Sequence, residues 1–73
     1  MPRPIKLSLV LKTLRKNGFV LVSQRGSHAK FRKIGNQTKT TIIKTSKKEI
    51  PLGTFKSILE LSGLNEEDFR NDK

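Results

Sequence analysis

Residues 19–45 read FVLVSQRGSHAKFRKIGNQTKTTIIKT, and their pattern is the main evidence for the fold class. It holds three runs rich in β-branched and aromatic residues, separated by short segments that contain Gly, Ser and Asn. Such runs between turn-forming residues are typical of β-strands. The sequence therefore predicts strands over residues 19–23, 28–34 and 38–45, with turns at residues 24–27 and at Gly35-Asn36. The second turn has the composition of a tight turn, so we expect the second and third strands to form a hairpin.

The second of these predicted strands alternates between apolar and basic residues. Ala29 and Phe31 occupy one parity, and the other holds His28, Lys30 and Arg32. Successive side chains of a strand point to opposite faces of the sheet. We therefore expect Ala29 and Phe31 to enter the core and the basic residues to lie on an open face.

The segment before the strands has helical periodicity. Over residues 5–17 the apolar residues recur at the spacing of one helix face: Leu7, Val10, Leu11 and Leu14. Pro4 stands where this helix can begin, and Gly18 stands where a left-handed residue would end it. Lys6 and Lys12 fall on the opposite side, where lysines more often form a solvated face.

A second helix follows a connection over residues 46–52 that includes Pro51. Thr54 is a suitable N-cap for this helix, and Gly63 is expected to end it. Four of its residues have the spacing of one helix face: Phe55, Ile58, Leu59 and Ser62. Residues 65–69 predict one more short helical turn, because its acids fall where the helix dipole favours them.

These elements give the order α-β-β-β-α. A three-stranded antiparallel sheet with two helices packed on one face is the simplest way to bury the apolar stripes. This is an α+β fold of the double-stranded-RNA-binding type. We expect one domain over residues 1–73, ordered over about residues 5–70 and ending in a frayed tail. Four aromatic residues lie on apolar stripes and are predicted to be core rather than base-stacking residues: Phe19, Phe31, Phe55 and Phe69.

Length and composition exclude several classes of site. The chain has 73 residues, no cysteine and one histidine, so a thiolate zinc site, a cysteine nucleophile and a multi-histidine metal cage are excluded. Gly-rich phosphate-binding motifs are absent, and no apolar run approaches the length of a membrane span. The first residues do not lead into a signal-peptide core. We therefore expect a small cytoplasmic domain with no cofactor, no metal and no membrane partner.

The net charge of +10 is unevenly distributed. Residues 1–48 carry thirteen Lys or Arg and no acid, whereas residues 49–73 carry all six acids. A folded domain with such a segment presents a strongly positive face, whose natural partner is a polyanion. The composition favours a nucleic acid as partner or substrate, and a ribosome-associated protein or mere solubility charge are the alternatives. The acids are too few to build a two-metal phosphodiesterase site on this surface.

The lone histidine is the residue best suited to chemistry. His28 can take a proton from a ribose 2′-hydroxyl or give one to a leaving 5′-oxygen. Nearby cations would hold the phosphate and stabilise its developing charge. The candidates for this contact are Arg25, Lys30, Arg32 and Lys44. The alternative is an exposed histidine at a strand start that contacts RNA or nothing.

Four sequence blocks, in this order, resemble the HicA family, the toxins of type II toxin–antitoxin pairs of bacteria and archaea. The blocks are Leu14-x-x-x-Gly18-Phe19, Arg25-Gly26-Ser27-His28-x-x-Phe31, Gly53-Thr54-Phe55-x-x-Ile58-Leu59 and Ser62-Gly63-Leu64. The resemblance covers roughly residues 8–69. It implies the double-stranded-RNA-binding-like fold and metal-independent, ribosome-independent cleavage of mRNA. It also implies a HicB-type antitoxin as partner, with contact to DNA only through that antitoxin.

The resemblance also assigns residues within the second block. His28 matches the catalytic histidine of the family, and Gly26 and Ser27 match the turn that presents it. Ser27 is therefore added to the expected RNA contacts. Many members carry a Pro-x-His segment after the third strand, where this chain has Lys44-Thr45-Ser46. Here Lys44 or Lys47 is expected to supply the phosphate contact instead. A non-catalytic RNA-binding module of the same fold is the alternative function.

Overall fold

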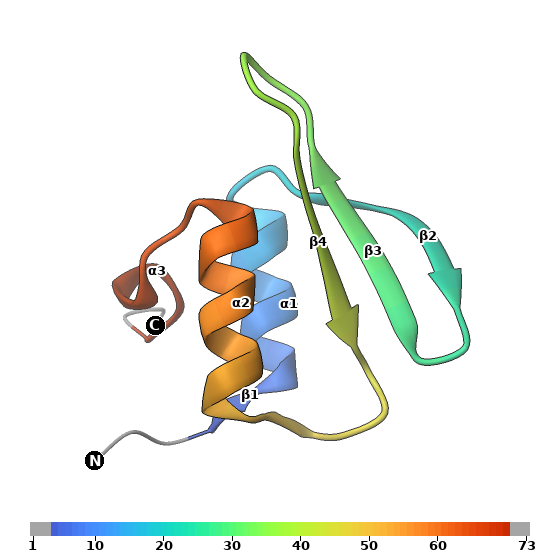
Figure 1. Cartoon of the computed structure of the whole chain (residues 1–73), viewed down its shortest axis with the longest axis vertical. Coiled ribbons are helices and arrows are strands. Elements are labelled where there is room, and N and C mark those ends of the chain that lie inside the picture. The colour runs from blue at the N-terminus through green and yellow to red at the C-terminus, as the bar shows by residue number, and fades with distance from the viewer. Residues whose placement is uncertain (1–3, 71–73) are drawn as a thin grey trace.

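The computed structural model describes residues 4–70 and contains two separate sheets. Its elements are β1 (Ile5–Lys6), α1 (Leu7–Lys16), β2 (Val20–Arg25), β3 (His28–Lys33), β4 (Lys39–Lys44), β5 (Glu49–Ile50), α2 (Leu52–Ser62) and α3 (Glu66–Arg70) (Figure 1). The main sheet is antiparallel with strand order β2-β3-β4, and β1 pairs with β5 in a two-stranded ribbon. Residues 1–3 and 71–73, which include the predicted tail, lie outside the described residues.

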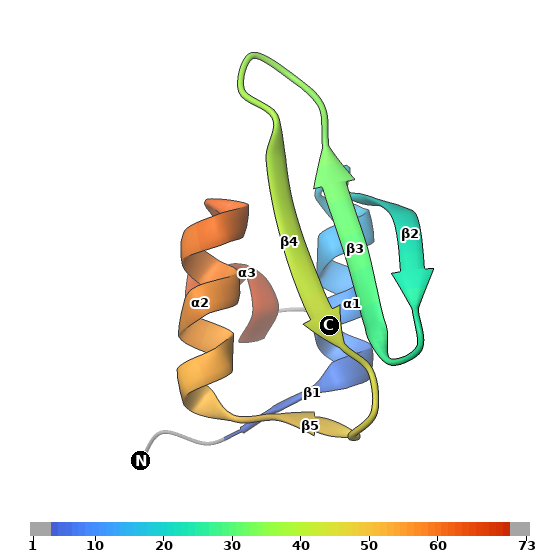
Figure 2. The ribbon, with the colours of Figure 1, turned by 45° about the vertical axis from the view of Figure 1, so that its right-hand side comes forward.

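The helices lie together on one side of the main sheet (Figures 1 and 2). α2 packs along β4, and α3 packs against α1. The predicted α+β fold, with a three-stranded antiparallel sheet and helices on one face, is therefore confirmed. The short third helix was also predicted, and it begins one residue later than expected.

The core lies between the helices and the main sheet. All four phenylalanines are buried there, with at most 2% of each side chain exposed. The rings of Phe55 and Phe69 meet edge to face at 5.2 Å between centroids, which fixes α3 against α2. The prediction that the phenylalanines belong to the core is confirmed, since buried rings are not available to stack on nucleobases.

The alternation predicted for β3 is confirmed. Ala29 and Phe31 are buried, whereas His28 is exposed and Lys30 and Arg32 are half-buried. Burial of the first pair in the core leaves the basic residues no position except the opposite face of the sheet. That face, which carries no helix, is called the open face below.

Strand β2 differs from the expected arrangement, because the helices leave it uncovered. All six of its residues are exposed, including Val20 at 56%, Leu21 at 47% and Val22 at 43%. It also runs two residues beyond the predicted end at residue 23, because Gln24 and Arg25 continue to pair with β3. β2 is thus an edge strand that overhangs the helical layer.

A β-bulge at Val22 interrupts the pairing of β2 with β3. Leu21 stands opposite Phe31, but Ser23 stands opposite Lys30, so two steps along β2 match one step along β3. A bulge of this kind reverses the parity of every residue that follows it. Directly opposed residues share a face, so Ser23 lies on the open face although Leu21 lies on the helical one.

Both predicted turns differ in length from those in the structure. Gly26 has φ +55°, and it forms with Ser27 a two-residue connection between β2 and β3 that is shorter than the predicted turn at residues 24–27. The predicted tight turn at Gly35-Asn36 is instead part of a five-residue loop over residues 34–38, in which no residue has a positive φ. This loop joins β3 to β4, and the predicted hairpin of these two strands is confirmed.

The first helix is shorter than predicted at its N-terminal end. Ile5 and Lys6 form β1, in which Ile5 pairs with Ile50 and Lys6 with Glu49. Ile5 and Ile50 are 2% and 3% exposed. The free energy gained by burying both isoleucines therefore outweighs that of one more helical turn at the start of α1. At the other end the prediction is confirmed, since Gly18 has φ +92° and ends the helix.

The start of the second helix is also corrected. α2 begins at Leu52, its N-cap residue is Pro51, and no side chain caps it. The amide of Phe55 donates to the carbonyl of Pro51 at 2.9 Å, so Thr54 already lies inside the first turn and cannot be the N-cap. The C-terminal prediction is confirmed, because Gly63 ends α2 with φ +72°.

Two buried threonine hydroxyls, those of Thr13 and Thr41, have no hydrogen-bond partner among the described residues. Removal of an unpaired buried hydroxyl relieves a desolvation cost of about 1–3 kcal/mol, offset by imperfect packing of the added methyl group. We expect Thr41→Val to raise the free energy of unfolding by about 1 kcal/mol, measured by urea denaturation. Thr40→Val is the matched control, because Thr40 accepts a hydrogen bond from Arg32. Equal destabilisation by both changes would contradict the prediction.

Candidate nucleic-acid interface

His28 lies at the centre of a cross-strand row on the open face. It stands directly opposite Arg25 of β2 and directly opposite Lys44 of β4. Opposed residues in antiparallel strands have Cβ atoms about 4.5–5.5 Å apart. His28 therefore has a basic residue directly opposite it on each neighbouring strand.

The next two rows continue the open face. Lys30 lies between Ser23 and Ile42, and Arg32 lies between Val20 and Thr40. The first of these rows closes off a shallow hollow of about 370 Å³ next to the imidazole. The hollow is lined by Ser23, Arg25, His28, Lys30 and Ile42. It therefore combines one group capable of proton transfer, two cations and one apolar wall.

Arg32 is fixed at the far end of this face. Its Nε donates to the hydroxyl of Thr40 at 3.3 Å, and the side chain is half-buried. One open-face row, that of Lys30, separates it from His28. Arg32 therefore lies on the same continuous face as His28, away from the imidazole.

The turn that presents His28 is anchored by Thr45, the residue that follows β4. Both the amide nitrogen and the hydroxyl of Thr45 donate to the carbonyl oxygen of Ser27, at 2.7 and 3.1 Å. The side-chain amide of Gln24 donates to the carbonyl of Gly26 at 3.2 Å. These bonds hold both turn residues, Gly26 from Gln24 on β2 and Ser27 from Thr45 on the other side.

The structure brings together most, but not all, of the predicted site residues. Arg25, Lys30 and Lys44 surround His28 on the open face. Ser27 is half-buried, and its carbonyl oxygen accepts both hydrogen bonds from Thr45 in the turn. Lys47 lies off the main sheet, in the connection that leads from β4 to β5. It lines a second hollow, together with Lys6 and Lys48.

Three residues of the site escaped the sequence analysis: Ser23, Ile42 and Thr45. The bulge at Val22 turns Ser23 onto the open face, and no residue type marks this bulge in the sequence. Ile42 is 50% exposed, contrary to the usual burial of isoleucine. Neighbouring residues on a strand face opposite ways. Assigning Ile43 to the core would therefore have placed Ile42 on the open face.

The electrostatic character of this face is uniform. No Asp or Glu occurs between residues 4 and 48, so β2, β3 and β4 contain none. The first acid is Glu49, which lies on the separate ribbon with β1. Cations on a surface without neutralising acids attract polyanions and raise their rate of association. This is the electrostatic character of a surface that binds the backbone of a nucleic acid.

The three-stranded antiparallel sheet, its helices and its basic open face are those of a small α+β domain of the double-stranded-RNA-binding type. Within that class, a comparison with protein families matches residues 8–64 to the family described as the HicA toxin of bacterial toxin–antitoxin systems. The match spans more than half of the 73 residues. The chain belongs to the HicA toxin family, and it is therefore a toxin of a toxin–antitoxin system.

A search of the curated proteins finds no match to this chain. Within residues 4–70, every helix falls short of the length and apolar character that a membrane span requires.

The anchoring of Ser27 generates a test of how His28 is positioned. Thr45→Val removes the hydroxyl that donates to the Ser27 carbonyl and keeps the backbone bond, so we expect a loss of about 0.5–1.5 kcal/mol in the free energy of unfolding. The only histidine of the chain is His28, so a single imidazole cross-peak in the NMR spectrum reports its environment. That cross-peak should shift in Thr45→Val and stay in place in Thr45→Ser, which retains the hydroxyl. An unchanged cross-peak in both variants would contradict the positioning role.

Proposed function

We propose that this toxin is a metal-independent endoribonuclease that cleaves mRNA, with His28 as its general acid or base. The observation that carries this proposal is the row of Arg25, His28 and Lys44 on an exposed face without acids. A proton-transfer group flanked by two cations is suited to the cleavage of a phosphodiester bond that carries negative charge. Membership of the HicA family supports the same reading.

The chemistry needs only groups that the row provides. His28 takes the proton of a ribose 2′-hydroxyl, and the 2′-oxygen attacks the adjacent phosphorus. The bond from phosphorus to the 5′-oxygen breaks, which leaves a 2′,3′-cyclic phosphate on one fragment. The departing 5′-oxygen receives a proton, which the protonated His28 can supply. The side chains of Arg25 and Lys44 would stabilise the extra charge on the phosphate during the transfer.

The remaining cations of the open face would bind the flanking RNA. Lys30 lines the hollow beside His28, and Arg32 lies one row beyond it. Contacts of this kind fix the position of the backbone without reading its sequence. Ile42, half exposed in the same hollow, offers an apolar surface to a base or sugar next to the scissile bond.

The central experiment compares His28→Ala with the unchanged protein in a cleavage assay on total mRNA in the presence of EDTA. General acid–base groups contribute about 100- to 10,000-fold to a rate, so we expect His28→Ala to lose at least about 100-fold in cleavage. Induced expression of the unchanged toxin should stop growth, and expression of His28→Ala should not. Lys56→Ala, an exposed change on α2, serves as the control and should remain toxic. Full cleavage by a correctly folded His28→Ala protein would refute the catalytic role.

The second candidate function is a non-catalytic RNA-binding module of the same fold. The observation that favours it is the segment Lys44-Thr45-Ser46, in which this chain has no second histidine to assist His28. A binding module would retain RNA intact over long incubation and would bind it in a salt-dependent manner. Growth would then be affected equally by the unchanged protein and by His28→Ala.

We also propose that a HicB-type antitoxin with an acidic surface silences this toxin in the cytoplasm by covering the open face. An acidic partner would neutralise the cations around His28 and exclude RNA at once. Contact with DNA would then come only through the antitoxin. The single imidazole cross-peak of His28 should shift and lose its solvent accessibility in the complex. A complex in which His28 stays exposed to solvent and RNA cleavage is nevertheless blocked would contradict this mode of inhibition.

A further inference from the structure

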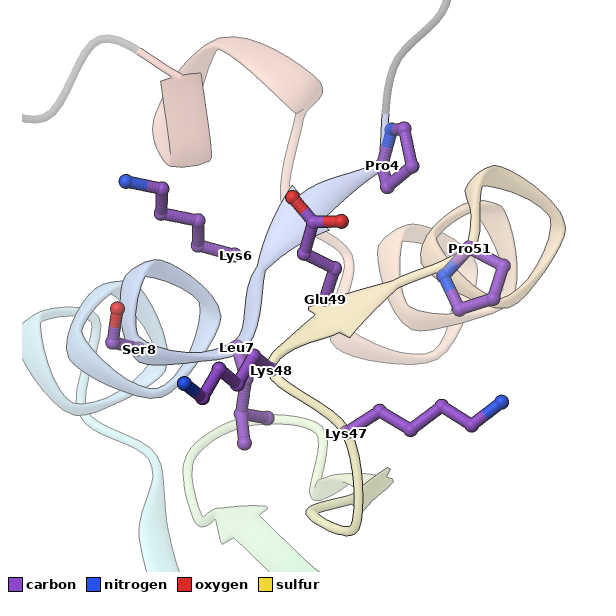
Figure 3. Close-up of a pocket in the computed structure, with 8 residues that line it drawn as sticks. All are labelled: Pro4, Lys6, Leu7, Ser8, Lys47, Lys48, Glu49 and Pro51. Carbon is purple, nitrogen blue, oxygen red and sulfur yellow. The ribbon is translucent and has the colours of Figure 1, made fainter.

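A second basic hollow lies at the end of the molecule to which the His28 turn also points. The β2–β3 turn, the β4–β5 connection and the β1–β5 ribbon all lie at this end (Figures 1 and 2). The hollow is open and has a volume of about 850 Å³. It is lined by Pro4, Lys6, Leu7, Ser8, Lys47, Lys48, Glu49 and Pro51 (Figure 3).

The lining combines the two kinds of surface that a nucleotide requires. In Figure 3, Lys6 and Lys48 extend toward the side of the ribbon on which Ser8 lies. Their ammonium groups are suited to a phosphate, and the Ser8 hydroxyl can donate to or accept from a sugar or base. Pro4, Leu7 and Pro51 add apolar surface to the lining for the flat face of a base, with Pro4 and Pro51 across the ribbon from Ser8 in Figure 3. The volume falls in the range of about 300–1,000 Å³ that is usual for sites of small organic ligands.

The hollow is connected to the His28 site through a short, anchored segment. Lys44 stands opposite His28, and Thr45 is bonded to Ser27 through two hydrogen bonds. Lys47, which follows Lys44 by three residues, lines the hollow. The chain between these two lysines therefore spans at most about 11 Å. At the other wall, the amide of Leu7 donates to the carbonyl of Lys48 at 2.8 Å, which ties α1 to the same connection.

We infer that this hollow is a nucleotide subsite, which holds one nucleotide of an RNA strand whose neighbouring segment lies across the open face at His28. The inference rests on the proposed function and adds to it a second point of attachment for the substrate. Lys6 and Lys48 bind the phosphate of this nucleotide, and the base lies against Pro4, Leu7 and Pro51. Glu49 stands opposite Lys6 in the ribbon. Its negative charge repels the phosphate and so limits the affinity of the subsite.

The test measures binding of a fluorescent dodecamer of uridine to the full chain in a His28→Ala background, across a series of salt concentrations. Each phosphate contact on a single strand contributes about 0.7 to the slope of log affinity against log salt, so Lys6→Ala with Lys48→Ala should reduce the slope by about 1.4. The affinity should fall by about tenfold at moderate salt. Lys12→Ala with Lys56→Ala is the matched control, because it removes the same charge from the exposed surfaces of α1 and α2. The two double variants would behave alike if only net charge mattered, and that result would overturn the subsite.

Two further variants keep the test independent of folding defects. Glu49→Gln removes the opposing charge without changing the shape of the side chain, so it should raise the affinity about two- to threefold, whereas Glu60→Gln on α2 should not. Ser8→Phe should fill the hollow and weaken binding while leaving the salt slope unchanged. No effect of either Glu49→Gln or Ser8→Phe would overturn the inference.

The outcomes for the subsite and for the proposed function can be separated. Intact RNA after incubation with the unchanged toxin, together with the expected effect of Lys6→Ala and Lys48→Ala on binding, would refute the nuclease and retain the subsite. Cleavage that depends on His28, together with equal binding by both double variants, would retain the nuclease and refute the subsite. A chain that does not bind the dodecamer at all would refute both.

Discussion

The burial of Ala29 and Phe31 sets the orientation of the central strand, and with it the positions of the basic residues around His28. Both side chains belong to the core between the sheet and the helices, and each is at most 3% exposed. Because a strand presents alternate residues to opposite faces, their burial fixes His28, Lys30 and Arg32 on the open face. A shift of one residue in the pairing of β3 would bury an imidazole and two cations in an apolar core, at a cost that a small domain cannot sustain. The same contacts that stabilise the fold thus orient the site.

The second determinant is the bulge at Val22, which brings β2 into the site. Leu21 pairs with Phe31 on the helical side, so an unbroken strand would place Ser23 and Arg25 on that side as well. The extra residue reverses the parity and turns Arg25 onto the face of His28. Bulges are common next to active sites because they re-aim a side chain without changing the rest of the sheet. One inserted residue therefore supplies a flanking cation on the side that β4 cannot reach.

Much of this arrangement could be predicted from the sequence, and the failures have physical reasons. The alternation in β3, the apolar stripe of α1 and the burial of the phenylalanines are local patterns, and the structure confirms them. The β1–β5 ribbon could not be predicted, because it pairs Ile5 with Ile50 across most of the chain. For the same reason Lys6, expected on the polar side of a helix, lies instead beside Lys48 in the second hollow. The bulge at Val22 has no composition of its own and follows from the packing of the whole sheet.

Because β2 overhangs the helical layer, the part of the interface on β2 is locally less stable than the part on β4. All six residues of this strand are exposed, so its detachment from β3 would break one ladder of hydrogen bonds and uncover little of the core. Segments of this kind open at a free energy far below that of global unfolding and exchange their amide protons first. β4, in contrast, is held between β3 and α2. Of the two cations beside His28, Lys44 is therefore a permanent part of the surface, whereas Arg25 is present only while the edge strand remains closed.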